Sequence, residues 1–396
     1  AWGNIVNTTT TYSETPAADG TWEYRALVQS GTCLTEYSSS RTITVDPASV
    51  GGTVSGGTTP ICFGDNTGVM TLSGHTGSVV SWQRQFNGGG WSNIAGTGGD
   101  LTYSEVPSSA GTWDYRVRVR SGSCVQAFST VRTIVVDPTS VGGSITGGNT
   151  PICIGSNTGV MTLSGHTGNI VRWERRLNAG GWVNINITTT THSEIPASAG
   201  TWTYRALVQS GVCSSTYSAT RSIVVDPASV GGNVTGGSTP LCLGEGTGVM
   251  TLSGHTGNIV RWQRRLDGGA WTNIANTNHT YSETPSGEGT WDYRAEVQSG
   301  ACASICSTAR TIVVNPLPTP VISGSNNVCA NVVGEVYSTP NVAGHTYNWA
   351  ISGGSITAGN GTNSITVTWG AAGAGWLRVT ETITATGCNV TTANYN

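Results

Sequence analysis

The sequence predicts an all-β protein made of β-sandwich domains in tandem. First, the stretch GVMTLSGHTG occurs three times without a change, at residues 68–77, 159–168 and 248–257. Second, short runs alternate apolar and polar residues and are separated by turn residues at spacings of about 8–12, which is typical of sandwiches. Third, no segment has the apolar periodicity of a helix.

The repeat sets the domain organisation. The tetrapeptides TVDP, VVDP, VVDP and VVNP end at Pro47, Pro138, Pro227 and Pro316, and their spacing of about 90 residues is the size of an independent domain. We therefore expect beads on a string: a partial repeat at 1–47, full repeats at 48–138, 139–227 and 228–316, and a divergent unit at 317–396 that is expected to be truncated. Because the chain opens inside the pattern of a repeat, it is expected to be a window of a longer chain.

The strands of a repeat are predicted from the alternation of apolar and polar residues. In GVMTLSG, Met70 and Leu72 alternate with polar neighbours, so this is a strand with one buried face, followed by the turn GHTG. In VVSWQRQFNGGGW, Val80 and Trp82 are expected on one face, and Asn87-Gly88 predicts a hairpin. TWDYRVRVRSG, from Thr112, alternates in the same way, and STVRTIVVDP is the last strand of the repeat.

Composition excludes several functions. Charged residues make up 10% of the chain and the net charge is −3, so there is no basic surface for nucleic acid. No apolar run approaches the roughly 20 residues that cross a bilayer. All 18 cationic residues are arginine, which excludes Schiff-base and phosphate-loop lysines and Lys–Asn isopeptide bonds.

The order of these motifs resembles immunoglobulin-like domains. A tryptophan lies in SWQRQ, RWERR and RWQRR, and Gly111–Tyr115 (GTWDY) resembles the tyrosine corner, with Trp113 in place of the corner tyrosine. More narrowly, the repeats resemble those of giant Bacteroidota surface proteins, including gliding-motility adhesins and other type IX secretion substrates. The last unit, with HTYNWAISGGSI and NSITVTWG, resembles PKD-like modules. The resemblance implies an extracellular, cell-surface protein.

Ten cysteines are present. Each full unit has one before strand B and one after strand F, and we expect these as disulfides within a domain in an oxidising compartment. In an immunoglobulin-like topology those positions lie at opposite ends of the sandwich, so a bond between neighbouring domains, such as Cys62 to Cys213, is the alternative. Cys33 and Cys306 are left over. The expected disulfide cysteines are Cys62, Cys124, Cys153, Cys213, Cys242, Cys302, Cys329 and Cys388.

Recurring polar residues have structural explanations. The histidines of GHTG (His75, His166, His255) are expected to bond to backbone in the turn. The YSE or HSE glutamates (Glu14, Glu105, Glu194, Glu283) are expected to pair with a recurring arginine (Arg25, Arg116, Arg205, Arg294) or to cap a turn. The junction carboxylates (Asp46, Asp137, Asp226) are expected in rigid Asp-Pro hinges, with Ca²⁺ as the alternative.

The predicted function lies in the array of domains. No residue is predicted to be catalytic, no metal or other cofactor is expected, and the protein is expected not to be an enzyme. The first hypothesis is a structural segment of an extracellular adhesin or fibre, with other copies or the rest of its own chain as partners. The alternatives are a binding module for surface glycans and a non-catalytic accessory region of a secreted enzyme. Glycan or lateral contacts would use Trp91, Trp182 and Trp271, although cross-strand packing explains these tryptophans as well.

Overall fold

The computed structural model describes residues 1–396 and contains strands and turns but no helix. By their contacts the residues form two compact units. One holds 1–148, 159–193 and 202–222, and the other holds 149–158, 194–201 and 223–396. The partial repeat belongs to the first unit and pairs β1 with β4 and β2 with β3. Its strands are β1 (Gly20–Tyr24), β2 (Leu27–Val28), β3 (Glu36–Tyr37) and β4 (Arg41–Val45).

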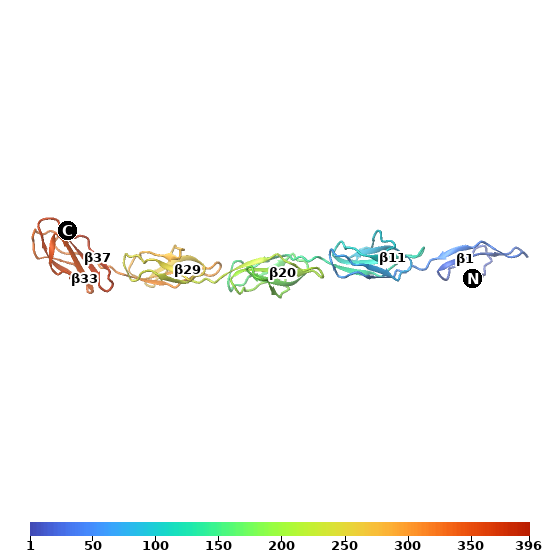
Figure 1. The fold of residues 1–396 in the computed structure, drawn as a ribbon, viewed down its shortest axis with the longest axis horizontal. Coiled ribbons are helices and arrows are strands. Elements are labelled where there is room, and N and C mark those ends of the chain that lie inside the picture. The colour runs from blue at the N-terminus through green and yellow to red at the C-terminus, as the bar shows by residue number, and fades with distance from the viewer. The chain divides into compact units, whose positions relative to one another are not determined.

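The first full repeat is a sandwich of two sheets. One sheet has the order β10-β7-β5, and the other has the order β6-β13-β11-β8-β9, with β12 added to β11. The long central strand β11 is labelled in Figure 1. The strands are β5 (Thr53–Gly56), β6 (Ile61–Cys62), β7 (Met70–Ser73), β8 (Ser78–Phe86), β9 (Ser92–Asn93), β10 (Thr102–Tyr103), β11 (Gly111–Arg120), β12 (Ala127–Phe128) and β13 (Arg132–Asp137). This arrangement is that of an immunoglobulin-like sandwich.

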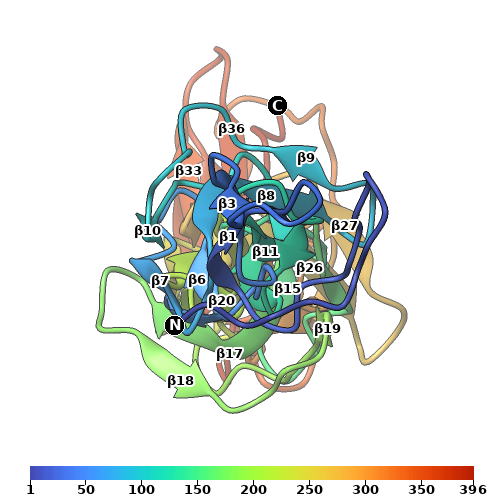
Figure 2. The same ribbon diagram turned by 90° about the vertical axis from the view of Figure 1, so that its right-hand side faces the viewer.

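The next two repeats use the same strand order. The pairing of β17 with β18 can be followed in Figure 2. The strands of the middle repeat are β14 (Ser144–Gly147), β15 (Ile152–Cys153), β16 (Met161–Ser164), β17 (Asn169–Leu177), β18 (Val183–Ile185), β19 (Thr191–His192), β20 (Gly200–Gln209), β21 (Thr216–Tyr217) and β22 (Arg221–Asp226). Those of the third are β23 (Asn233–Gly236), β24 (Leu241–Cys242), β25 (Met250–Ser253), β26 (Asn258–Leu266), β27 (Thr272–Ile274), β28 (Thr280–Tyr281), β29 (Gly289–Gln298), β30 (Ile305–Cys306) and β31 (Arg310–Asn315).

The last unit is a smaller sandwich of two three-stranded sheets. Their orders are β32-β35-β34 and β33-β36-β37. Trp349, Val367 and Val379 are buried between them. The strands are β32 (Glu335–Ser338), β33 (His345–Ser352), β34 (Gly354–Ala358), β35 (Ser364–Trp369), β36 (Trp376–Ile383) and β37 (Asn389–Thr391). The all-β prediction is therefore confirmed along the whole chain.

The core of a repeat follows the predicted alternation, with one correction. Met70 and Leu72 are buried on β7, and Trp82 is fully buried. The residue that shares the core face with Trp82 is Val79, whereas Val80 is only half-buried. The reason is a β-bulge: the register between β8 and β11 shifts at Arg118/Val119, which places one extra residue in β8 and changes the face of the residues before it.

Two predicted local motifs are confirmed. Asn87 and Gly88 have φ values of 47° and 71°, and positive φ at both positions is what a tight hairpin turn requires. The corner tryptophan works as a corner tyrosine does, since Trp113 Nε1 donates to Ser109 O four residues upstream at 2.9 Å. Trp291 makes the same bond to Gly287 O.

Candidate functional site: the joint between successive domains

The disulfides link neighbouring domains. Cys62 of the first full repeat bonds to Cys213 of the second, with their Cα atoms 4.9 Å apart. The predicted pairing within each domain is therefore wrong, and the alternative pairing between neighbours is the observed one. The three bonds are Cys62–Cys213, Cys153–Cys302 and Cys242–Cys388, and Cys33, Cys124, Cys306 and Cys329 are free.

The topology explains why a bond within a domain does not form. β6 runs parallel to β13, with Cys62 opposite Asp137 at the C-terminal end of its repeat. Cys124 follows β11, beyond the opposite end of β13, where Arg132 pairs with Tyr115. The Cys124 thiol lies instead 3.4 Å from Pro47 O, at the junction with the preceding repeat. The two cysteines of one repeat are therefore at opposite ends of the same sheet.

A short turn after β20 supplies the rest of the joint. Val212 N donates to Asp137 Oδ2 at 3.0 Å, and Ser210 N donates to Ser140 Oγ at 2.9 Å. Gly211 lies between them with φ of 47°, and a Cβ atom there would be 1.8 Å from Asp137 Oδ2. A glycine is required because the conformation is left-handed and because the carboxylate occupies the space of a side chain. The motif S-G-x-C is thus a docking turn for the Asp-Pro of the preceding domain.

The same geometry occurs at two other junctions. At the junction before the third repeat, Ala301 N donates to Asp226 Oδ2 at 2.7 Å and Ser299 N to Ser229 Oγ at 2.9 Å. At the junction before the first full repeat, Ser123 N donates to Asp46 Oδ2 at 2.8 Å. Cys124 is free there but lies in the place of Cys213. These aspartates are therefore acceptors for the docking turn.

The last joint keeps the disulfide but not the carboxylate. Asn315 stands where the earlier joints have aspartate, and its backbone oxygen accepts from Leu243 N at 3.0 Å. Cys388, in the PKD-like unit, is fully buried and bonds to Cys242 with a Cα–Cα distance of 5.6 Å. The aspartate and its docking turn are therefore absent from this joint, and the disulfide is what it shares with the two joints before it.

The repeated stretch GVMTLSGHTG supports the joint from inside its own domain. The backbones of Val50 and Thr76 exchange two hydrogen bonds of 3.1 and 3.0 Å. A Cβ atom on Gly77 would lie 2.5 Å from Ser121 N, in the docking turn. The turn GHTG thus packs against both the segment that follows the Asp-Pro and the docking turn, which gives the motif a structural role.

The histidines of this turn are not part of a metal-binding cluster. Nδ1 of His166 and of His255 is buried and makes no hydrogen bond, so these two histidines do not bond to backbone through this atom. The His255 ring lies 5.0 Å from the ring of His279, which has no counterpart in the other repeats. No group of three or more His, Cys, Asp or Glu side chains is placed to hold a metal ion.

The recurring glutamate is bound inside its own repeat. Glu105 pairs with Arg84 and accepts hydrogen bonds of 2.8 Å from the hydroxyls of Tyr103 and Tyr115. The predicted pairing of Glu105 with Arg116 is therefore wrong, because Arg116 lies on the face of β11 opposite to that of Tyr115. Burial is the main cause that raises the pKa of Tyr115 well above its ordinary value, and the hydrogen bond to Glu105 is the second. The carboxylate thus ties β8, β10 and β11 together.

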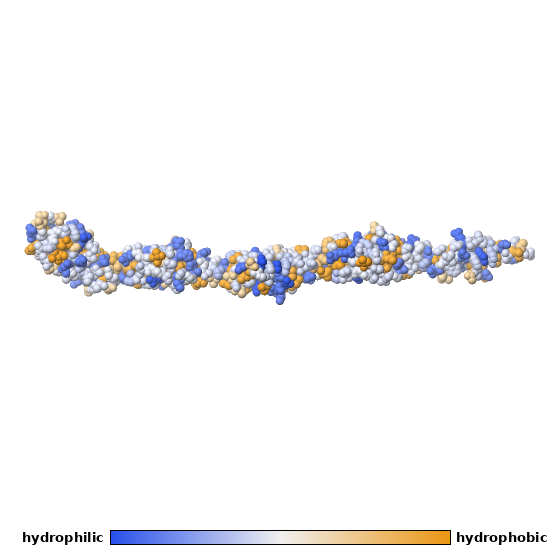
Figure 3. All heavy atoms as spheres, in the orientation of Figure 1, coloured by the Kyte–Doolittle hydropathy of each residue, from blue (hydrophilic) through white to orange (hydrophobic).

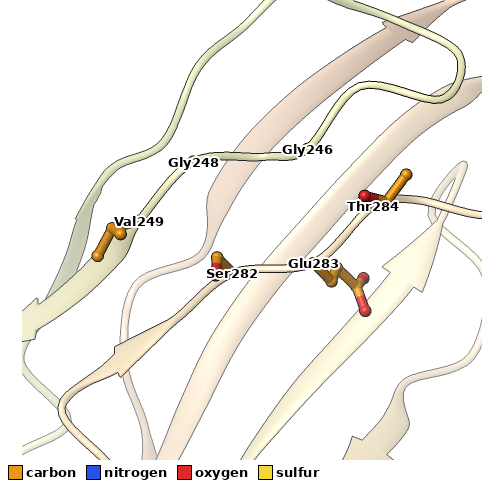
Figure 4. A pocket seen from close by; sticks show the side chains of 6 residues that line it. All are labelled: Gly246, Gly248, Val249, Ser282, Glu283 and Thr284. Carbon is orange, nitrogen blue, oxygen red and sulfur yellow. The ribbon is translucent and has the colours of Figure 1, made fainter.

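The equivalent glutamate borders a hollow without pointing into it. A cavity of about 280 Å³ is lined by Gly246, Gly248, Val249, Ser282, Glu283 and Thr284. Figure 4 shows the Glu283 side chain on the side of its segment away from Gly246 and Gly248. Its carboxylate pairs with Arg264 and accepts from Tyr293 at 2.8 Å. It is therefore held in a structural cluster rather than presented to a ligand.

The tryptophans after the hairpin are stacked on arginine. The guanidinium of Arg116 lies 4.0 Å from the ring centroids of both Trp91 and Phe128. Arg205 lies in the same way between Trp182 and Tyr217, at 3.9 and 3.6 Å. In the third repeat Arg294 stacks on Trp271 at 3.9 Å, and Cys306 replaces the second aromatic ring. One face of each tryptophan is thus covered, which matches the packing alternative more closely than a sugar platform.

Comparison with known proteins places these domains. The family model "Domain of unknown function (DUF8696)" matches residues 1–47, 50–138, 141–227 and 230–316, and a PKD-like domain model matches residues 315–395. No curated protein matches the chain.

Solved structures with some similarity include the chicken CNTN1 FN1-FN3 domains, at 9% identity and a TM-score of 0.27, covering 68% of this chain and 99% of that one. A marsupial T cell receptor has 12% identity and a TM-score of 0.22, and covers 64% and 100%.

Proposed function

We propose that this chain, which belongs to the DUF8696 domain family over four of its units and carries a PKD-like domain after them, is a structural segment of a long extracellular adhesin or cell-surface fibre. The observation that carries this proposal is the joint. At three successive junctions the peptide chain and a disulfide both cross from one domain to the next. Two covalent connections restrict how a domain can turn against its neighbour.

The disulfides of the joints support an extracellular location. Disulfides persist in oxidising compartments. Separately, the chain contains no helix that could span a membrane. The face in Figure 3 shows hydrophilic and intermediate residues with hydrophobic ones scattered among them. Export by a type IX system of a Bacteroidota cell and a role in gliding belong to the same proposal and rest on the resemblance of the repeats.

The proposal includes the absence of catalysis and of a bound cofactor. Each recurrent carboxylate of the joint accepts backbone hydrogen bonds, and each YSE glutamate of the first and third full repeats is held by an arginine and two tyrosines. These groups are therefore engaged in structural contacts. We propose other copies of the chain, or the rest of its own chain, as partners.

Immunogold electron microscopy of the cells that make the protein tests this function. An antibody against one repeat is expected to label fibres or filaments at the cell surface, and cells in which the gene is deleted serve as the control. Label found only on soluble material in the medium would contradict the structural proposal and would favour a free binding protein or the accessory region of a secreted enzyme.

A further inference from the structure

We propose that the disulfides between neighbouring domains act as a mechanical clamp that makes the array nearly inextensible and keeps tension away from most of each domain core. The biological meaning of this clamp rests on the proposed structural function, whereas its mechanics follow from covalent connectivity. Each disulfide closes a long loop of the chain, with sequence separations of 151, 149 and 146 residues. The loop closed by Cys153–Cys302 overlaps the other two, because Cys153 lies between Cys62 and Cys213, and Cys242 lies between Cys153 and Cys302.

Two of the bonds create a short covalent path through the array, because the loops that they close follow one another closely along the chain. From Cys62 the path crosses to Cys213, follows the backbone to Cys242, and crosses to Cys388. Only about 30 residues of backbone lie on this path, and at 3.3–3.6 Å each they span at most about 100 Å. Along the backbone alone Cys62 and Cys388 are about 330 residues apart, and the same chain without disulfides extends to about 1,100 Å.

About half of the connector from Cys213 to Cys242 is already extended as β-strand. It contains the strands β21, β22, β23 and β24. A strand already rises about 3.3 Å per residue, so pulling on these residues lengthens them very little. Tension that enters at Cys62 therefore reaches Cys388 before the rest of the middle repeat is loaded.

Most of each core lies outside the path, although a few core residues, such as Ile223 and Leu241, lie on it. In the middle repeat the fully buried Trp173 and Tyr204 belong to the loop that the Cys62–Cys213 bond closes. In the third repeat Trp262 and Tyr293 belong to the loop closed by Cys242–Cys388. A force on the chain ends cannot pull these residues apart while the bonds are intact. Force is thus carried along the segment that contains β22 and β23, while most of each core stays inside the closed loops.

The three disulfides are not equivalent, and this provides a matched control. Cys153–Cys302 does not lie on the shortest path, so its removal leaves a path of about 30 residues. Removal of Cys62–Cys213 forces the path through Cys153–Cys302 and back to Cys242, which is about 150 residues or about 500 Å. Both changes remove one bond of nearly the same loop size, so a general loss of stability affects both alike.

Peptide mapping and single-molecule stretching test the clamp on the full chain. Mass spectrometry of the non-reduced natural protein is expected to find Cys62–Cys213, and a Cys62–Cys124 peptide would overturn the inference. For stretching, Cys33, Cys124, Cys306 and Cys329 are replaced by serine and the termini are attached to beads through peptide tags. The parent is expected to show no unfolding step of about 90 residues, the size of a domain, from the clamped region.

The two double variants decide the result. C153S/C302S is expected to reach the same final length as the parent, whereas C62S/C213S is expected to become longer by about 400 Å. Equal lengths for the two variants would overturn the clamp. This test is independent of where the protein is located, so a failed immunogold experiment and a failed clamp are separate outcomes.

Discussion

Replacing Gly211 with alanine is predicted to open the docking turn of the second joint. The residue has φ of 47°, and a Cβ atom would meet Asp137 Oδ2 at 1.8 Å. A left-handed conformation costs a residue with a side chain roughly 1–2 kcal/mol. Displacing the carboxylate also removes its hydrogen bond from Val212 N, and bonds to charged groups contribute about 1.5–3 kcal/mol. Because this bond is exposed, the lower value applies, and the sum is about 3 kcal/mol.

Hydrogen exchange measures this opening directly. A change of about 3 kcal/mol corresponds to roughly a hundredfold faster exchange of the Val212 amide, since 1.4 kcal/mol is a factor of ten. The measurement uses exchange followed by mass spectrometry on the oxidised full chain, after confirming that Cys62–Cys213 is formed. Gly181→Ala is the control, because nothing lies within 4 Å of a Cβ atom there. Exchange of Val212 within threefold of wild type, or an equal change in the control, would refute the reasoning.

Three further predictions concern the interior of the repeats. Trp82→Ala is expected to destabilise the first full repeat by about 3–5 kcal/mol because its side chain is fully buried, whereas Trp91→Ala removes a half-exposed cation–π contact worth about 1 kcal/mol. Urea unfolding, followed by hydrogen exchange of β11, compares the stability of the two variants. Equal losses of stability would contradict the burial of Trp82 as the cause. The pKa of Tyr115 is raised by burial and by its hydrogen bond to Glu105, so the stabilisation from this group is complete below the unfolded-state pKa of about 10 and is lost as pH rises above it. Tyr115→Phe should therefore show a smaller drop in urea midpoint than the wild type between pH 8 and 11. A drop equal to that of the wild type would count against this link between ionisation and stability. Cys306→Tyr is expected to restore the aromatic pair around Arg294 and to stabilise the third repeat by about 0.5–1 kcal/mol, and a lower urea midpoint would show that the site does not accept the ring.

Short-range patterns in the sequence are enough to predict the fold class, the repeat and most local structure. Alternation along GVMTLSG and TWDYRVRVR predicted strands with one buried face, because side chains in a strand point to opposite sides in turn. The glycine-dependent turn at Asn87-Gly88 and the corner role of Trp113 also depend on neighbours within a few residues, so they could be inferred from short stretches.

Contacts between side chains that are far apart in the sequence depend on how the strands are arranged in three dimensions. Cys62 is about 60 residues from Cys124 and about 150 from Cys213, but the shorter separation lies between opposite ends of a sheet while the longer one closes at a joint. The partner of Glu105 was decided in the same way, by the face of β11 on which Arg116 lies. The bulge in β8 placed Val79 rather than Val80 in the core, because one extra residue reverses the face that a simple count assigns.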